Sequence, residues 1–219
     1  MKRSYRQYCA VAKALDVVGN RWALLIVREL LVGPRRFGDL MDALSGIGTN
    51  LLSQRLRELQ EADVVGKRTL PPPAGSVVYE LSERGRDLAP AILTLAHWGT
   101  PFLGAPRRGE QFRTHWLVIA GKAAFRPEAA RETEISCELR ASETDASYFR
   151  IADGRFEISE GPLADPDLVL AGRPSDLIEL LAGQVTPARA LANGIELTGK
   201  RSTLDRLLEM FDFPAAAGE

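Results

Sequence analysis

The chain has 219 residues, and 45% of them are hydrophobic, which is enough to bury a core and allows one or two domains of about 100–150 residues. Its charge is divided unevenly: residues 1–108 hold 16 of the 28 Lys and Arg but 10 of the 29 Asp and Glu. A basic first half therefore precedes an acidic second half. Such asymmetry indicates two domains, of which the first meets a polyanion and the second does not.

Several classes of protein are disfavoured at once. The two cysteines, Cys9 and Cys137, are too few for a disulfide scaffold or a structural zinc site. No apolar run approaches the roughly 18–20 residues of a membrane helix, and no apolar segment follows the basic start. We expect a cytoplasmic protein that does not cross a membrane and holds no metal or cofactor.

The first half predicts helices with clear ends. Apolar residues recur at helical spacing over residues 11–31, with a break expected at Gly19-Asn20, and Gly33-Pro34 ends this pattern. Residues 37–44 form a second, short amphipathic segment. Gly46-Ile47-Gly48 then predicts a turn.

The next predicted helix carries the main functional signal. Thr49 is a suitable N-cap, and Leu52, Leu56 and Leu59 form its apolar stripe. The remaining face carries side chains that hydrogen-bond to base edges or phosphates in DNA-reading helices, namely Asn50, Ser53, Gln54 and Arg57, with Arg55 beside them. An ordinary solvated face is the alternative.

A β-hairpin is predicted directly after this helix. Residues 64–70 and 77–81 have the pattern of strands, and the proline-rich segment 71–76 joins them. Lys67 and Arg68 lie at the base of the hairpin, where cations reach phosphates and fix position without reading sequence. A purely structural hairpin is the alternative, but helix, turn, helix and hairpin together favour a DNA-binding wing.

These features also carry a family resemblance. Residues 8–104 resemble the HxlR-type transcriptional regulators through an ordered series of motifs: Cys9, residues 15–22, residues 28–37, the helix over 52–59, residues 79–82, Arg84-Gly85 and Trp98-Gly99. The resemblance implies a homodimeric winged helix that binds double-stranded operator DNA, with a recognition helix over residues 49–62. Arg35 and Arg36, within the motif at residues 28–37, complete the candidate DNA contacts.

The resemblance is incomplete at some of these contacts. Gly48, Asn50 and Gly66 stand where the family often has Ser, Lys and a charged residue, and Ser76 replaces a common basic residue. These departures predict fewer phosphate contacts.

The segment 83–103 is expected as one helix whose stripe of Leu88, Ile92, Leu95 and Trp98 packs across the dimer axis; packing within its own domain is the alternative.

Cys9 supports a different regulatory hypothesis. Some members of the resembling family sense thiol-reactive compounds through a cysteine at this place. Reactivity requires a thiolate, which the nearby cations Arg6 and Lys13 favour, whereas Ala10 and Val11 favour a buried and inert thiol. A thiol or redox-sensing regulator with a purely structural C-terminal domain is therefore the alternative function.

The second half predicts a mixed fold after a linker at residues 101–109. A helix is expected over 111–125, followed by strands at 134–140, 147–152, 155–159 and 167–170, with a hairpin turn at Asp153-Gly154. Helices at 174–182 and 187–193, a strand at 195–198 and a helix at 202–211 complete the α+β layout.

Residues 110–213 resemble the sterol-carrier-protein-like domain. The motifs are Asp153-Gly154, residues 166–170, residues 180–183, Ala192-Asn193-Gly194 and residues 197–200. The resemblance implies a cavity for a lipid-like or other apolar small molecule. Its candidate lining is Trp116, Ile119, Phe149, Leu170, Leu180, Leu191, Leu204, Leu208 and Phe211. A filled core made by the same side chains is the alternative.

An enzyme is the competing class, and the sequence argues against it. The two histidines, His97 and His115, fall in different predicted domains, and no phosphate loop, nucleophile elbow or metal cluster is present. A winged helix that binds protein instead of DNA is a third class. We therefore expect a mostly α protein with β, comprising a winged helix-turn-helix domain over 1–104 and an α+β sterol-carrier-like domain over 110–219. Its function would be sequence-specific transcription regulation modulated by an apolar ligand.

Overall fold

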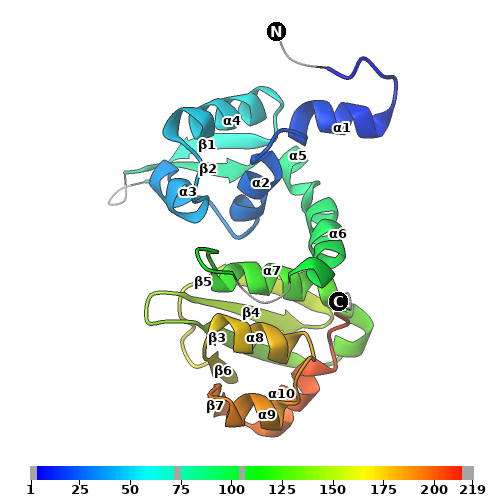
Figure 1. Ribbon diagram of the computed structural model, residues 1–219, viewed down its shortest axis with the longest axis vertical. Helices are drawn as coiled ribbons and strands as arrows, with labels where there is room; N and C mark the ends of the chain where they lie inside the picture. The colour runs from blue at the N-terminus through cyan, green and yellow to red at the C-terminus, as the bar shows by residue number, and fades with distance from the viewer. Residues whose placement is uncertain (1–3, 72–74, 104–106, 214–219) are drawn as a thin grey trace. The chain divides into compact units, whose positions relative to one another are not determined.

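The computed structural model describes residues 4–71, 75–103 and 107–213. The chain forms two compact units, Met1–Ile92 and Leu93–Glu219 (Figure 1). Their division falls within a helix, upstream of the linker expected at 101–109. Residues 104–106 of that linker and 72–74 of the expected wing tip lie outside the described residues, and each unit is considered by itself.

Unit 1 is a winged helix-turn-helix, as the sequence predicts. Its elements in chain order are α1 (Ala10–Val18), α2 (Ala23–Leu31), α3 (Phe37–Ala43), α4 (Thr49–Glu61), β1 (Val65–Thr69), β2 (Val77–Leu81), α5 (Glu83–Arg86) and the start of α6 (Ala89–Gly99). Buried residues of α2, α3, α4 and the hairpin form one core, in which Ile26, Leu40, Leu52 and Leu56 are almost fully enclosed. This core fixes the helices around the hairpin (Figure 1).

The break predicted within residues 11–31 is real and separates α1 from α2. Trp22 is the N-cap of α2 and has a φ of 82°, a left-handed conformation that is rare for a bulky side chain. Its ring packs against the core of unit 1. The turn between α1 and α2, which the Gly19-Asn20 pair predicts, therefore places the Trp22 indole against the core.

The single helix expected over residues 83–103 is wrong. The structure has α5, then α6, then a short 3-10 helix, Thr100–Phe102. The Ser82 hydroxyl accepts a hydrogen bond from the Gly85 amide and so caps α5. Pro90 stands at the second position of α6, and because proline lacks an N–H it suits the first turn of a new helix better than the interior of a long one.

A second correction concerns the start of α4. The helix begins at Thr49, but Gly48 is its N-cap and no side chain caps it. Thr49 is therefore the first helical residue and not the cap. The stripe of Leu52, Leu56 and Leu59 is buried as expected, so the face of α4 that meets solvent is unchanged by this shift.

The hairpin β1–β2 is antiparallel, with Lys67 opposite Tyr79 and Arg68 opposite Val78. Arg35 adds a short bridge on the other side of β2: its amide donates to the Tyr79 carbonyl at 2.9 Å, and the Tyr79 amide donates back at 2.7 Å. The segment before α3 is thereby joined to the wing.

Unit 2 contains the mixed α and β structure predicted from the sequence. Its elements after α6 are α7 (Thr114–Ala124), a 3-10 helix (Pro127–Ala130), β3 (Glu134–Arg140), β4 (Ala146–Ala152), β5 (Arg155–Glu160), β6 (Leu168–Ala171), α8 (Pro174–Leu181), α9 (Pro187–Ala192), β7 (Glu196–Gly199) and α10 (Arg201–Leu208). Asp153 and Gly154 form the predicted turn between β4 and β5, and both have positive φ.

The strands form a five-stranded sheet of order β5-β4-β3-β6-β7, antiparallel except for the β3–β6 pair. Alternate residues such as Ile135, Phe149 and Leu170 face a core that also contains buried residues of α7, α8 and α10. Because these helices share one core with one side of the strands, they cover that side. The other side presents polar residues.

Candidate nucleic-acid interface

Helix α4 carries the candidate side chains Asn50, Gln54 and Arg57, and all three are exposed. They occupy the face away from the buried leucines because positions 50, 54 and 57 share one side of a helix. Thr49 is exposed and Ser53 is half-buried at the edge of this face. The structure therefore brings five of the six candidates on α4 to one exposed polar surface.

Arg55, the sixth candidate, is held by its own unit. Its side chain is 16% exposed, its Nη1 donates to Glu58 Oε2, and its Nε donates to the carbonyl of Arg21 at 3.3 Å. Gln54 Nε2 donates to the other oxygen of Glu58 at 2.9 Å. One carboxylate thus engages two of the residues expected to meet DNA.

Asn50 and Arg57 differ from Gln54 and Arg55. Within the described part of the chain, neither side chain makes a hydrogen bond or an ion pair. Each retains its full hydrogen-bonding capacity for a partner outside the chain. Arg57 offers a planar fork of donors, which suits guanine or phosphate, and Asn50 offers a donor and an acceptor, which suits adenine.

The cations of the wing are partly engaged. Arg68 Nε donates to Glu80 Oε2 at 2.8 Å, with both side chains substantially exposed. The Lys67 ammonium lies 5.8 Å from the centre of the Tyr79 ring. Arg35 is half-buried at the base of the wing, where its Nε donates to the Glu29 carbonyl at 3.4 Å, whereas Arg36 is exposed before α3.

The N-terminal part of the chain is similar to known helix-turn-helix transcriptional regulators. Residues 17–106 match the family described as HxlR-like helix-turn-helix. An uncharacterised helix-turn-helix transcriptional regulator of Synechocystis is 35% identical over 95 residues, which cover 43% of this chain and 70% of that protein. The chain belongs to the HxlR family.

Two further relatives are also described as helix-turn-helix transcriptional regulators. The regulator YodB of Bacillus subtilis is 32% identical over 89 residues, covering 41% of this chain and 80% of YodB. An uncharacterised regulator of Mycobacterium bovis is 43% identical over 97 residues, and here the chain spans 61% of the relative's length. Among solved structures, the oxidised redox regulator HypR is 31% identical, with a TM-score of 0.39 over 42% of this chain and 94% of that one.

The HxlR unit also contains a buried acid that the sequence analysis did not identify. Glu29 is fully buried in α2, and its Oε1 accepts hydrogen bonds from Arg28 Nη2 at 2.6 Å and Arg28 Nε at 2.9 Å. A buried carboxylate needs such charge-assisted partners to offset desolvation. The adjacent Arg-Glu pair within a predicted helix was the available sequence signal.

The two cysteines occupy opposite environments. Cys9 is exposed at the N-cap of α1, so the buried position that its apolar neighbours favour is wrong. Cys137 is fully buried in β3, and burial, followed by the nearby charges of Glu138 and Asp167, raises the pKa of its thiol. Within the described ranges, no cluster of His, Cys, Asp or Glu is suited to a metal ion, and no helix could span a membrane.

The apolar residues expected to line a ligand cavity in unit 2 mostly pack on one another. Phe149, Leu170, Leu180 and Leu204 are buried in the core, and Leu191, Leu208 and Phe211 pack against it. The rings of Phe149 and Phe156 stack with centroids 4.8 Å apart. Ile119 is buried, while Trp116 is half-buried with its ring near His115. This packing favours the filled-core alternative.

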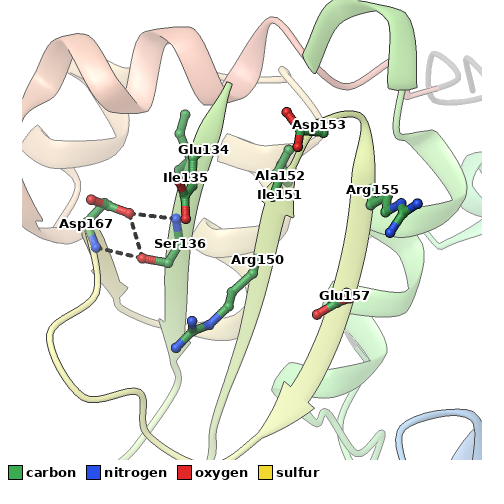
Figure 2. Close-up of a pocket in the computed structure, with 10 residues that line it drawn as sticks. All are labelled: Glu134, Ile135, Ser136, Arg150, Ile151, Ala152, Asp153, Arg155, Glu157 and Asp167. Carbon is green, nitrogen blue, oxygen red and sulfur yellow. Dashed lines mark hydrogen bonds between the residues drawn. The ribbon is translucent and has the colours of Figure 1, made fainter. Parts of the chain in front are cut away.

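The polar side of the sheet holds a hollow of about 490 Å³ that the sequence analysis did not predict (Figure 2). It is lined by charged residues of β3, β4 and β5, including Glu134, Arg150 and Glu157, and by Asp167. Ser136 and Asp167 are joined by three hydrogen bonds at its margin. The chemistry of this lining differs from the apolar site expected for a lipid-like molecule.

Proposed function

We propose that this HxlR-type transcriptional regulator binds double-stranded DNA sequence-specifically, with α4 in the major groove and the hairpin against the backbone. The observation that supports this most strongly is Arg57, an exposed arginine on the polar face of α4 that has no ion-pair partner in the described structure. Asn50 and Gln54 flank it on the same face. Arginine, asparagine and glutamine are the side-chain types that commonly pair with guanine and adenine in the major groove.

The direct test is binding of the full chain to the promoter region of its own gene at several salt concentrations. Phosphate contacts release counterions, so the logarithm of the binding constant should fall linearly with the logarithm of salt concentration. Affinity that does not change with salt would contradict the proposal and favour a protein-interaction module.

The proposal includes a homodimer, which would present two copies of α4 to one palindromic site. Its support is apolar surface left exposed on α1 and α6: Val11 and Leu15 on the first, Leu95 and Trp98 on the second. Sedimentation equilibrium of the wild type and of Trp98→Asp tests it. A dimer that weakens in the variant is expected, and a monomeric wild type would overturn it.

Regulation through Cys9 is a second candidate, favoured by the exposure of this thiol. The chain is similar to HypR, which is described as a redox regulator. It is also similar to the transcriptional regulator YodB. We expect an oxidant to change DNA binding in the wild type but not in Cys9→Ser. Equal oxidant sensitivity in both proteins would remove this hypothesis.

Binding of an apolar molecule by unit 2 rests on the resemblance to sterol-carrier-like domains and on the sheet with helices over one side. The stacked rings of Phe149 and Phe156 favour a filled core instead. Organic extraction of the purified chain, followed by mass spectrometry and addition of any recovered compound to the DNA-binding assay, tests the hypothesis. A chain that carries and binds no such compound would exclude it.

A further inference from the structure

A continuous chain of hydrogen bonds links the backbone between α1 and α2 to the exposed polar face of α4. It begins at the carbonyl of Arg21, between α1 and α2, which accepts from Arg55 Nε. Arg55 Nη1 donates to Glu58 Oε2, and Glu58 Oε1 accepts from Gln54 Nε2 at 2.9 Å. The side chains of Arg55 and Glu58 are only 16% and 29% exposed. Gln54, at the outer end, is exposed.

This arrangement fixes the direction of the Gln54 amide. If the amide rotated by half a turn, its carbonyl oxygen would face the Glu58 carboxylate, and two acceptors would repel each other. Arg55 in turn prevents the carboxylate from turning away, because its guanidinium is bound to the backbone of Arg21. A side chain held in this way loses less freedom when it binds its target.

The fixed orientation has a chemical consequence. A glutamine amide has two N–H donors and one carbonyl acceptor. One N–H of Gln54 is used by Glu58, which leaves one N–H and the carbonyl oxygen. Adenine presents one acceptor and one donor in the major groove, N7 and the N6 amino group, and a glutamine amide pairs with both.

We infer that Glu58 is a positioning residue that makes Gln54 selective for adenine and keeps Arg55 away from the DNA phosphates. The inference rests on the proposed function. Glu58 contacts no base in this account; it acts through Gln54. Its removal should therefore change the base preference at one position of the DNA site, a change that a merely structural residue would not produce.

The experiment is selection of binding duplexes from a random-sequence pool by the full-length chain. Gln54→Ala identifies the base pair that Gln54 reads, where the wild type should prefer adenine. Glu58→Ala should reduce discrimination at that base pair alone by about five- to tenfold, part of the selectivity of one bidentate contact. In the double variant Gln54→Ala/Glu58→Ala, loss of Glu58 should add nothing.

Two variants separate positioning from charge. Glu58→Gln keeps an acceptor oxygen for Gln54, so it should retain the preference for adenine while binding every duplex more tightly. Glu61→Ala removes the same charge from the same helix and should leave the preference at that base pair unchanged. Thermal unfolding confirms that each variant is folded.

Unchanged base preference in folded Glu58→Ala, or a loss that simply adds to that of Gln54→Ala, would overturn the inference. If Arg57→Ala nevertheless weakens binding to the selected duplexes, the proposed function stands without it. A wild-type chain that enriches no duplex would overturn both.

Discussion

Gly85 and Val64 approach so closely that no side chain fits between them. A Cβ added to Gly85 would lie 2.1 Å from the carbonyl oxygen of Val64. The same carbonyl accepts a hydrogen bond from the Ser82 amide at 3.1 Å. This contact holds the start of α5 against the residue that precedes the wing, so it couples the position of the hairpin to the helices that follow.

Replacing Gly85 should therefore destabilise unit 1. We expect Gly85→Ala to lower the free energy of unfolding by about 1–3 kcal/mol, because the backbone of Val64 cannot yield as a flexible side chain would. Gly38→Ala is the matched control: an added Cβ there meets nothing within 4 Å, and alanine favours helix α3 by up to about 1 kcal/mol. Urea unfolding of both variants measures the difference, and a Gly85→Ala chain as stable as the wild type would contradict the contact.

The two thiols should react very differently with a maleimide. Cys9 is exposed, whereas Cys137 is fully buried and has a pKa raised by burial. Because the thiolate is the reactive species, we expect one thiol per native chain to react and both to react in denaturant. Mass spectrometry gives the count. Native Cys9→Ser that reacts at the wild-type rate would show that the environments were assigned wrongly.

Asp167 should make unit 2 sensitive to acid. The Ser136 hydroxyl, and then the Ser136 amide, hold the pKa of this carboxyl below its ordinary value (Figure 2). A lowered pKa in the folded state stabilises the fold above the ordinary pKa, and this contribution is lost as pH falls through the folded value. Between about pH 5 and pH 2, the Tm of the wild type should therefore decrease more than that of Ser136→Ala. Parallel curves for the two proteins would exclude this role of the pair.

The sequence predicted those parts of the fold that depend on neighbours along the chain. The stripe of Leu52, Leu56 and Leu59 defined α4, and Asp153-Gly154 placed the β4–β5 turn, since both signals are local. The contact between Gln54 and Glu58 could also have been predicted, because the two residues stand at i and i+4 on a helix, where side chains meet.

Other features depend on residues far apart in the sequence. The bridge between Arg35 and Tyr79 and the bond from Arg55 to the Arg21 carbonyl join separate elements, and no local pattern indicates them. Whether unit 2 has a filled core or a cavity was likewise undetermined, since the same apolar residues suit both. Because no local pattern indicates the bond to the Arg21 carbonyl, Arg55 was predicted as a DNA contact, although its side chain is bound within unit 1.

The central claim is that α4 reads DNA through its exposed face, and Arg57 tests it most directly. Binding of the full chain to its promoter region should be compared with that of Arg57→Ala and of Arg155→Ala, an exposed arginine on the sheet of unit 2. We predict that Arg57→Ala weakens binding by about 1–3 kcal/mol, roughly 5- to 150-fold, if it contacts a base, and less if it contacts a phosphate. Arg155→Ala should bind like the wild type. Wild-type affinity in Arg57→Ala, or an equal loss in both variants, would contradict the account.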